Sequence, residues 1–385
     1  MIPYGRQDIS QDDIDAVVEV LTSNFLTQGP KVPEFESKVA QYCGAKHGVA
    51  VNSATSALHI ACLALGIGPG DIVWTSPISF VASANCVLYC GGTVDFVDID
   101  PDTFNMSADE LRSKLEAAEK LDKLPKAVIP VHMAGQSCDM EAIYDLSLQY
   151  GFKIIEDASH AIGGSYKDSK IGSCKYSDMT VFSFHPVKII TSAEGGMVMT
   201  NDDELHNQLN LFRSHGITRD SEQMKHEPHG PWYYEQVNLG YNYRMTDVHA
   251  ALGTTQMNRL DEFVSDRNKR AQLYMQELDN TGLQLPICRE SSQSAWHLFI
   301  IKLNCSENLD QQRLLFEAMR KEGITVNLHY IPIHMQPYYQ SLGFSMGDFP
   351  QAESYYKSAM TIPLYPTLTE SEQLLVINTL NKFVN

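Results

Sequence analysis

The sequence predicts an α/β protein in which a large, mostly parallel β-sheet is followed by a smaller α+β domain. Short apolar runs rich in β-branched residues alternate with helical patterns from about residue 45 to residue 200. Past Asp247 a long helical pattern passes through Leu260 and Phe263 towards Leu278, and strand and helix signals mix after it. We therefore expect a large domain over residues 1–250 and a small C-terminal domain over residues 251–385.

Short apolar runs supply the strands of the predicted sheet. These runs are Gly48–Asn52, Asp71–Thr75, Thr93–Asp98, Ala127–His132, Lys153–Glu156, Met179–Phe184 and Gly196–Thr200. Helical patterns fall between several of them, for example at Asp139–Tyr150, which opens on a capping aspartate. Such an alternation indicates a largely parallel sheet with helices on both faces, in which ligands bind at the carboxyl ends of the strands.

The remaining elements lie towards the two ends of the chain. Near the N-terminus, Gln11–Thr22 is predicted to form an amphipathic helix, with apolar residues at Ile14, Val17, Val18 and Leu21. In the C-terminal part, strand and helix signals alternate over His297–Leu303, Leu309–Lys321, Thr325–Tyr330 and Thr369–Phe383. Thr369 and Glu372 have the spacing of a capping box, which marks the start of the last helix.

The composition excludes several classes of protein. A formal net charge of -18 argues against nucleic-acid binding, which requires a basic face, although a local basic pocket could still hold a phosphorylated ligand. The stretch from Ile72 to Val94 has no charged residue, but Pro77 and Gly91–Gly92 interrupt it. We expect a strand, a turn and a buried helix there rather than a membrane span.

The cysteines and the N-terminus indicate a cytoplasmic protein. The 8 cysteines are scattered, with no Cys-x-x-Cys pair and no histidine at zinc spacing. They are therefore predicted to be small buried residues in a reducing compartment, and no metal site is expected. The first ten residues, MIPYGRQDIS, have no apolar core of a signal peptide.

Lys188 is the first candidate for chemistry. It is the one lysine in the mostly apolar stretch Val181–Gly196, and Glu194 is its nearest charged neighbour along the chain. A dry site favours the neutral amine, which can attack a carbonyl and form a Schiff base. The alternative is a lysine that extends from a loop to solvent along its aliphatic stem.

Two further segments at strand ends supply polar groups. In VNSATSALH, residues 51–59, a strand ends at Asn52 and a helix begins among small hydroxyl residues, which can bind a phosphate or simply cap the helix. In KIIEDASHA, residues 153–161, a strand ends in Glu156 and Asp157. A carboxylate there can pair with a protonated pyridine nitrogen, or it can form an N-cap or a loop ion pair.

The other polar groups follow in an order that suits a pyridoxal phosphate site. Ser183 lies five residues before Lys188 at a predicted strand end, and His160 follows the carboxylates by three residues. Further on, LGYNYRMTD offers Asn242 and Arg244 between aromatic neighbours, either for a phosphate or as a surface loop. Along the chain these segments give a phosphate-binding helix start, a carboxylate, a serine, the lysine and an asparagine loop.

The chain resembles the DegT/StrS-type sugar-nucleotide aminotransferases. The resemblance begins near Tyr4 and continues through NFLTQGP (24–30), NSATSALH (52–59), TSPISFVASAN (75–85), EDASHA (156–161), FSFHPVKIITSAEGGMV (182–198), LFRSHG (211–216), GYNYRMTDVHAALG (240–253), VNLHYIPIH (326–334) and PLYPTLTE (363–370). It implies the aspartate-aminotransferase-like fold, known as fold type I, a homodimer with shared active sites, and pyridoxal 5'-phosphate as cofactor. Within the family the segments most resemble the UDP-4-amino-4,6-dideoxy-N-acetyl-β-L-altrosamine transaminases of pseudaminic acid biosynthesis.

Residue roles follow from this resemblance. It makes Lys188 the catalytic Schiff-base lysine and Asp157 the partner of the pyridine nitrogen, with His160 against the cofactor. It assigns the cofactor phosphate to Ala54, Thr55, Ser183 and, from the second subunit, Asn242. It assigns contacts with the UDP-sugar to Tyr4, Asn24, Phe25, Leu26, Thr27, Leu328, His329, Tyr330 and Ile331.

The implied reaction moves an amino group from L-glutamate to C4 of a UDP-linked 4-keto-6-deoxy-N-acetyl-hexose. Pro186, Val187 and Ile189 differ in detail from relatives, so the lysine loop does not specify the sugar. A related dehydratase carries histidine in place of the lysine, so Lys188 favours transamination over dehydration. The alternatives are a sugar dehydratase, another NDP-4-keto-sugar aminotransferase, and a non-enzymatic regulator.

Overall fold

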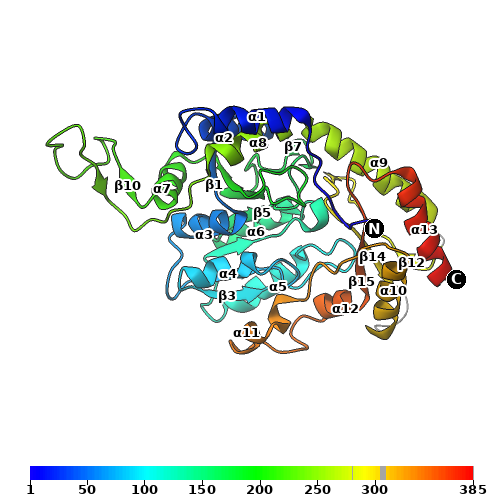
Figure 1. The fold of residues 1–385 in the computed structure, drawn as a ribbon. Coiled ribbons are helices and arrows are strands. Elements are labelled where there is room, and N and C mark those ends of the chain that lie inside the picture. The colour runs from blue at the N-terminus through cyan, green and yellow to red at the C-terminus, as the bar shows by residue number, and fades with distance from the viewer. Residues whose placement is uncertain (280, 304–308, 385) are drawn as a thin grey trace.

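A seven-stranded sheet lies at the centre of the molecule (Figure 1), with strand order β1-β9-β8-β5-β4-β2-β3. The computed structural model describes residues 1–279, 281–303 and 309–384. The strands of the central sheet are β1 (His47–Val51), β2 (Ile72–Thr75), β3 (Thr93–Phe96), β4 (Ala127–Ile129), β5 (Lys153–Asp157), β8 (Met179–Ser183) and β9 (Gly196–Thr200). These strands are the apolar runs predicted from the sequence, with ends that shift by a few residues.

The central sheet is mostly parallel, as predicted. β3, β2, β4, β5 and β8 run parallel to one another, whereas β9 is antiparallel to both β8 and β1. β4 is shorter than expected and ends at Ile129, because Pro130 has no N–H group to continue the ladder. Val131 returns to the neighbouring strand through an isolated bridge with Asp157.

Helices cover both faces of this sheet and bury its side chains. Val49 and Val51 belong to one apolar core and Ala50 to another, because successive side chains of a strand point to opposite faces. The first face packs against α3 (Ala54–Ala64), α4 (Ala82–Tyr89) and α7 (Asp203–Arg213). The opposite face is covered by α2 (Lys31–Cys43), α5 (Ala108–Glu119), α6 (Met140–Tyr150) and α8 (Asp247–Gln256).

The C-terminal part has its own three-stranded sheet and its own core. Its strand order is β12-β14-β15, with β12 (Leu283–Gln284), β14 (Phe299–Leu303) and β15 (Ala359–Ile362). Around it lie α9 (Leu260–Leu278), α10 (Leu309–Lys321), α12 (Pro350–Ser358) and α13 (Glu370–Val384). The short α11 (Pro337–Gln340) instead lies against α4, where the Tyr339 hydroxyl donates to Asn85. Ile2 from the N-terminus joins this second core. The domain boundary at residue 250 stays a prediction.

The predicted strand at Thr325–Tyr330 was wrong. Two isolated bridges, Ile2 with Ile324 and Asn327 with Thr361, are all the strand pairing that the structure describes around this segment. Leu328, His329 and Tyr330 instead line a cavity. Val326 packs in the C-terminal core and the residues after it face the cavity, so this strand-like segment is buried without joining a sheet.

The helix starts follow the expected capping chemistry. The Asp139 side chain accepts a hydrogen bond from the amide of Ala142 and caps α6. At α13, the amide of Thr369 donates to Glu372 and the amide of Glu372 donates to Thr369 Oγ1. The long pattern past Asp247 is interrupted by the short 3-10 helix η2 (Met257–Arg259), which separates α8 from α9.

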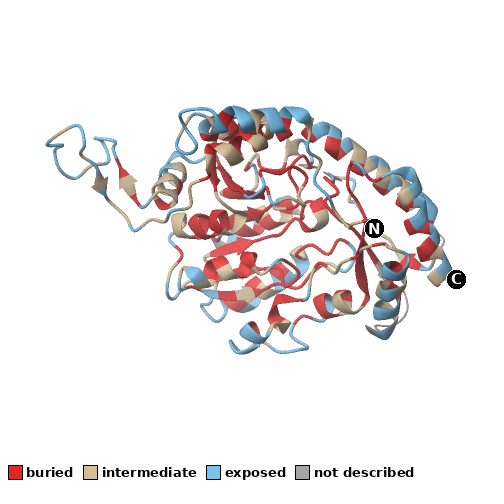
Figure 2. Cartoon of the chain, viewed as in Figure 1, coloured by how far each residue is buried: buried red, intermediate tan, exposed pale blue. Residues whose placement is uncertain are grey.

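An arm projects from the body of the molecule between α7 and α8 (Figure 1). Its two strands, β10 (Ile217–Thr218) and β11 (Glu235–Gln236), pair antiparallel, and most of the arm is exposed (Figure 2). Helix α1 (Gln11–Leu21) forms as predicted, but Ile14, Val18 and Leu21 are exposed rather than buried. In a single chain, the arm and α1 thus leave apolar side chains uncovered.

The remaining short elements complete the chain. They are η1 (Met133–Gly135), η3 (Ile333–Met335), β6 (Ser165–Tyr166), β7 (Ser169–Lys170) and β13 (Ser292–Gln293). β13, β6 and β7 form a small sheet of their own. No helix in the described part of the chain is both long enough and apolar enough to cross a membrane.

Candidate active site

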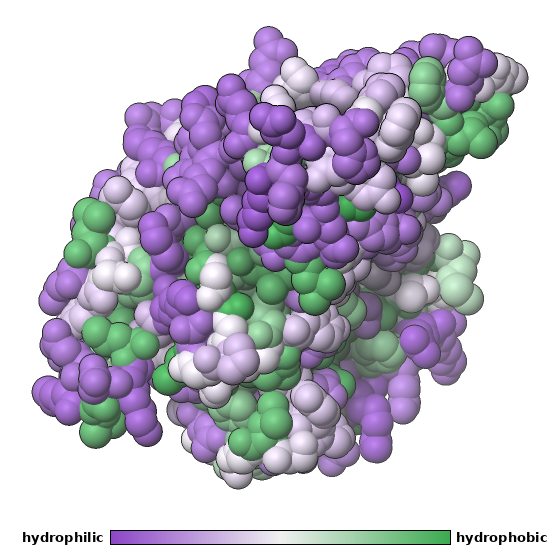
Figure 3. Space-filling model, turned by 90° about the vertical axis from the view of Figure 1, so that its left-hand side faces the viewer, coloured by the Kyte–Doolittle hydropathy of each residue, from purple (hydrophilic) through white to green (hydrophobic). Residues whose placement is uncertain are grey.

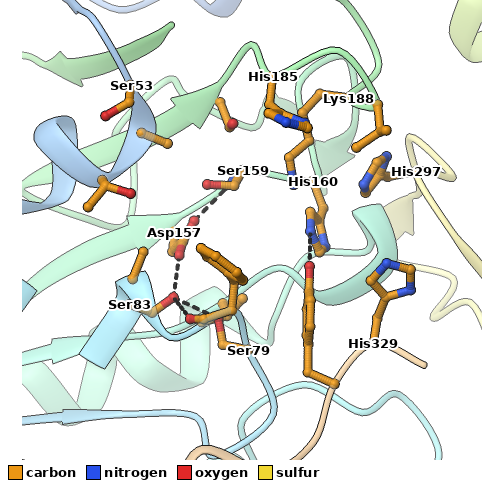
Figure 4. A pocket seen from close by; sticks show the side chains of 18 of the residues that line it. Ser53, Ser79, Ser83, Asp157, Ser159, His160, His185, Lys188, His297 and His329 are labelled. Carbon is orange, nitrogen blue, oxygen red and sulfur yellow. Dashed lines mark hydrogen bonds between the residues drawn. The ribbon is translucent and has the colours of Figure 1, made fainter. Parts of the chain in front are cut away.

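A cavity of about 410 Å³ opens at the carboxyl ends of β5 and β8 (Figure 4). This is the edge at which parallel sheets bind ligands. Segments far apart in the sequence form its wall, from Tyr4 near the N-terminus to Tyr330 in the C-terminal part. The volume suits a cofactor-sized ligand with part of a substrate.

The start of helix α3 forms one side of the cavity. Ser53 caps the helix by accepting a hydrogen bond from the amide of Ser56. Helix capping was one of the two roles that the sequence predicted for the hydroxyl residues of this segment. The backbone amides of Ala54 and Thr55 donate no hydrogen bond to any group in the described part of the chain. Unpaired amides at a helix N-terminus, facing a cavity, form an anion-binding site.

A glycine allows β9 to pass directly behind this helix start. A β-carbon added to Gly196 would lie 2.5 Å from the carbonyl of Ser53 and 2.6 Å from the amide nitrogen of Ala54. The approach is too close for any side chain. The glycine pair after Glu194 therefore seats the helix start on the sheet, and Gly195 lines the cavity next to it.

Asp157 stands at the end of β5 and is 4% exposed. Its Oδ2 accepts a 2.6 Å hydrogen bond from Ser83 Oγ, and its Oδ1 accepts a 3.1 Å hydrogen bond from the amide of Ser159. Ser79 Oγ lies 2.6 Å from Ser83 Oγ. Since Ser83 gives its proton to the carboxylate, Ser79 must donate to Ser83, and the two hydroxyls form a chain directed at Asp157 (Figure 4).

Glu156, the neighbour of Asp157 on β5, points to the other face of the sheet. It accepts hydrogen bonds from His132 Nε2 at 2.7 Å and from Thr180 Oγ1 at 3.0 Å, and a third from Ser177. Burial raises the pKa of Glu156, but these hydrogen bonds outweigh it and hold the pKa below its ordinary value. Of the two carboxylates at this strand end, Asp157 is the one that faces the cavity.

Lys188 follows β8 in a turn, where its amide donates to the carbonyl of His185. Burial lowers the pKa of the Lys188 amine to about 8, while the charge of Asp157 opposes the shift. About a tenth of the amine is therefore neutral at pH 7, far more than for an exposed lysine. The neutral amine is the nucleophilic form that the sequence predicted from the apolar surroundings.

Histidines surround the lysine on the other side of the cavity. His160, His297 and His329 are buried, and burial is the largest cause of their lowered pKa values, followed by nearby positive charges that include Lys188. His160 Nε2 lies 3.2 Å from the hydroxyl of Tyr330. The three rings are therefore neutral in the cavity as it stands.

Most of the residues proposed from the sequence meet in this cavity. The proposed cofactor residues that line it are Ala54, Thr55, Asp157, His160, Ser183 and Lys188. The proposed sugar contacts that line it are Tyr4, Leu328, His329 and Tyr330.

The other proposed residues lie outside the cavity of a single chain. Ile331 is 44% exposed, and Asn24, Phe25, Leu26 and Thr27 form an exposed loop after α1. Asn242 is also exposed, and its backbone forms an isolated bridge with Ser214. Each of these could reach a cavity only in a second copy of the chain or after a rearrangement.

Sequence reasoning missed several residues of the cavity wall. Ser79, Phe80 and Ser83 follow β2 before and within α4, and His185 and His297 complete the wall near Lys188. The first three lie in TSPISFVASAN, where a hydroxyl-rich segment after a predicted strand was a usable signal. No local signal marked His297, which is the first residue of the predicted strand His297–Leu303 in a different part of the chain.

A family model for the DegT/DnrJ/EryC1/StrS aminotransferases matches residues 7–381. The chain belongs to this family. Among curated relatives, the Bacillus subtilis spore coat polysaccharide biosynthesis protein SpsC is 39% identical and aligns over 96% of this chain and 94% of its own length. The Campylobacter jejuni UDP-4-amino-4,6-dideoxy-N-acetyl-beta-L-altrosamine transaminase is 37% identical over 99% of this chain and 96% of its own length.

Solved structures of the family have the same fold. Helicobacter pylori PseC, an aminotransferase involved in pseudaminic acid biosynthesis, superposes with a TM-score of 0.90 at 32% identity and covers 100% of this chain and 99% of its own. The putative sugar aminotransferase Spr1654 from Streptococcus pneumoniae, in its PLP-form, has a TM-score of 0.89 at 29% identity, with coverage of 100% and 98%. The expected fold type I architecture is confirmed, and the protein is a sugar aminotransferase that depends on pyridoxal 5'-phosphate.

The cavity fits this cofactor. The unpaired amides at the start of α3 suit its phosphate, and Asp157 offers a carboxylate to its pyridine nitrogen. Lys188 supplies an amine of lowered pKa on the same wall. The three groups follow β1, β5 and β8, which lie close together in the central sheet, and all of them line one cavity.

Proposed function

We propose that the enzyme transfers an amino group from L-glutamate to C4 of a UDP-linked 4-keto-6-deoxy-N-acetyl-hexose, as in pseudaminic acid biosynthesis. The observation that carries this proposal is Lys188, a lysine of lowered pKa in one cavity with Asp157, in a chain whose relatives include a named UDP-sugar transaminase. A lysine at this position suits transamination, which needs an amine that can move a proton.

The cofactor residues have distinct roles in this proposal. Lys188 would hold the cofactor covalently, and Asp157 would pair with the pyridine nitrogen. Ala54, Thr55 and Ser183 would bind the phosphate, together with Asn242 of a second subunit. His160 would lie against the ring. The cofactor, when bound, supplies an electron sink for the carbanion formed at the donor.

Lys188 is also the proposed acid–base group. Once displaced by the donor, its amine removes the proton from the α-carbon of glutamate and later delivers a proton to C4 of the sugar. The lowered pKa supports both roles, since an amine near its pKa can accept and return a proton at neutral pH. Ser83 and the amide of Ser159 keep the Asp157 carboxylate oriented while this occurs.

The UDP-sugar is proposed to contact Tyr4 and residues 328–331, with the exposed loop Asn24–Thr27 completing the site. The Tyr4 and His329 rings pack at 5.2 Å and form a wall of the cavity. Because Asn24–Thr27 lies outside the cavity of its own chain, we propose that it serves the site of the second subunit.

A homodimer is part of the proposal. The uncovered apolar residues support it, among them Trp232, Tyr234 and Leu239 of the arm, at 68%, 49% and 73% exposure, and Phe25 at 53%. The face from which the arm projects has several hydrophobic patches within hydrophilic surface (Figure 3). Exposed apolar side chains in this number are typical of a protein interface.

We also propose a cytoplasmic location. The structure describes every cysteine except Cys305, and the described cysteines form no disulfide. Even Cys62 and Cys86, whose sulfur atoms lie 3.7 Å apart, are not linked. Unlinked thiols at such a distance suit a reducing compartment.

The decisive experiment is a coupled assay with UDP-linked 4-keto sugars. Incubation with L-glutamate should produce 2-oxoglutarate and an amino sugar, and NMR of the product should establish whether the C4 amine is axial or equatorial. Formation of a deoxy sugar without 2-oxoglutarate would instead identify a dehydratase. A purified protein without bound cofactor, with no product from any 4-keto sugar nucleotide tested, would favour a regulator.

A further inference from the structure

His297 is a buried polar residue in the cavity without a partner. Its side chain is 4% exposed, and its ring lines the cavity (Figure 4). Nδ1 is buried without a hydrogen bond, and no hydrogen bond of Nε2 exists among the residues that the structure describes. A buried imidazole without hydrogen bonds loses free energy relative to water, so such a group in a cavity indicates a missing ligand atom.

The groups around His297 are neutral or positive. The His160 ring lies 4.4 Å away between ring centroids, tilted by 46°, and His329, Lys188 and Arg267 are the other titratable groups whose charge acts on it. Arg267 points away, because its guanidinium donates to the backbone carbonyls of Trp296, His297 and Leu364. The carboxylates Asp157 and Glu194 also line the cavity, but the charges that act most on the ring are positive, so its site would attract an anion.

The position next to Lys188 decides which anion this is. The amino group of the donor must reach the same cofactor atom as the Lys188 amine. The α-carboxylate of an amino acid is attached to the carbon that bears this amino group, so it must also lie close to Lys188. The diphosphate of a sugar nucleotide is attached at C1, on the opposite side of the sugar ring from C4. The described cavity wall has no arginine that could take either group.

We propose that His297 is the binding site for the α-carboxylate of the amino donor. This inference rests on the proposed function and adds the residue that recognises the first substrate. A neutral imidazole has one N–H to donate, and a carboxylate beside it stabilises the protonated ring. Donor binding is therefore accompanied by the uptake of a proton from solvent onto His297, and it weakens as the pH rises above neutrality.

Calorimetric titration of the holoenzyme with glutarate tests this. Glutarate has the carboxylates of glutamate but no amine, so it reports binding without turnover. Measurement at pH 7.5 in two buffers of different ionisation enthalpy should give an uptake of about one proton. His297→Asn should weaken glutarate binding at least about tenfold and abolish the proton uptake, because a charge-assisted hydrogen bond is lost. His297→Gln, whose longer side chain can place an amide N–H nearer the position of Nε2, should recover part of the affinity without the proton uptake.

His206→Asn is the matched control, since this half-buried histidine lies on α7 and does not line the cavity. It should bind glutarate like the wild type. UDP affinity and cofactor absorption should be unchanged in every variant, which shows that the site is folded. The proposal is overturned if glutarate does not bind, if it binds without proton uptake, or if His297→Asn and His206→Asn have equal effects. An enzyme that binds glutarate in this way but aminates no 4-keto sugar would refute the proposed function alone.

Discussion

Two ionisable side chains on neighbouring parallel strands determine the chemistry at the residue scale. Asp157 ends β5, and Lys188 follows the end of β8, the next strand in the sheet. Burial lowers the pKa of the lysine, and the hydroxyl of Ser83 and the amide of Ser159 orient the aspartate. A nucleophilic amine and an oriented carboxylate are thus available in one cavity before any ligand binds.

The pH dependence of cofactor attachment should report the pKa of Lys188. Below about pH 8 the rate of covalent attachment to the cofactor-free enzyme should rise about tenfold per pH unit, and above it the rate should level off, because the neutral amine is then the main form. Borohydride trapping followed by mass spectrometry measures the attachment. Lys188→Ala should show none, and Lys153→Ala, at an exposed lysine, should behave as the wild type. A rate that still rises at pH 10 would refute the lowered pKa.

Ser83→Ala should weaken cofactor binding. The change removes the 2.6 Å hydrogen bond to Asp157 and costs about 1.5–3 kcal/mol, or roughly a factor of ten to a hundred in the cofactor dissociation constant, because the acceptor is a buried carboxylate. Equilibrium dialysis with pyridoxal phosphate measures this constant. Ser83→Thr keeps the hydroxyl and should bind nearly as tightly as the wild type. Equal affinities for the alanine and wild-type proteins would show that Ser83 does not orient Asp157.

At the scale of elements, a buried hydrogen-bond network around His132 and Glu156 connects the strand ends next to the site. The amide of Cys138 donates to His132 Nδ1 at 3.1 Å, so Nε2 carries the ring proton and donates to Glu156. The amide of His132 donates to the carbonyl of Asp157. The loop after β4 is therefore tied to the end of β5 on the face opposite the cavity.

Glu156→Gln should lower the free energy of unfolding by about 3 kcal/mol. The NH2 group of glutamine would face the N–H and O–H donors that now bind the carboxylate. Urea unfolding of the cofactor-free protein measures the loss. In the wild type the contribution of Glu156 is present above the ordinary carboxyl pKa and is lost as the pH falls through its lowered folded value. The variant should therefore lose less stability than the wild type between pH 6 and about pH 4. A parallel decline in both proteins would contradict the assignment.

At the scale of the whole molecule, the cavity joins parts of the chain that fold around different cores. Ala54 and Lys188 belong to the large sheet and its helices, whereas His297 and Leu328–Tyr330 come from the C-terminal part. Helix α9 and the N-terminal segment connect the two parts, since Ile2 packs in the C-terminal core. The arm and α1, in contrast, leave apolar side chains on the outside.

The proposed homodimer should depend on the arm. Sedimentation should give about twice the 43.1 kDa mass of one chain for the wild type. Trp232→Asp should raise the dimer dissociation constant at least about tenfold, because it puts a charge into an apolar contact. Leu121→Asp, at a 67% exposed residue after α5, is the matched control and should leave the dimer intact. A wild-type monomer, or equal effects of the two changes, would refute the arm as an interface.

Helices and strands were predicted accurately where a short stretch of sequence is enough to specify them. Strands of the central sheet are short, apolar and bounded by turns, so each run marks its own strand. The segment Thr325–Tyr330 has the same pattern but lines the cavity, because an apolar side chain can be buried by a ligand site as well as by a sheet. Strand order and the antiparallel direction of β9 depend on partners distant in the chain, which no local pattern encodes.

The sequence by itself determined the chemical groups and their carriers: Lys188 in an apolar run, Asp157 at a strand end, and a helix that begins at Ala54. Only the tertiary structure decided that Asp157 rather than Glu156 faces the cavity, that Ser83 holds it, and that His297 stands unpaired beside the lysine. The reason is physical. Residue type and local period follow from the chain itself, whereas burial, hydrogen-bond partners and pKa shifts arise from segments that only folding brings together.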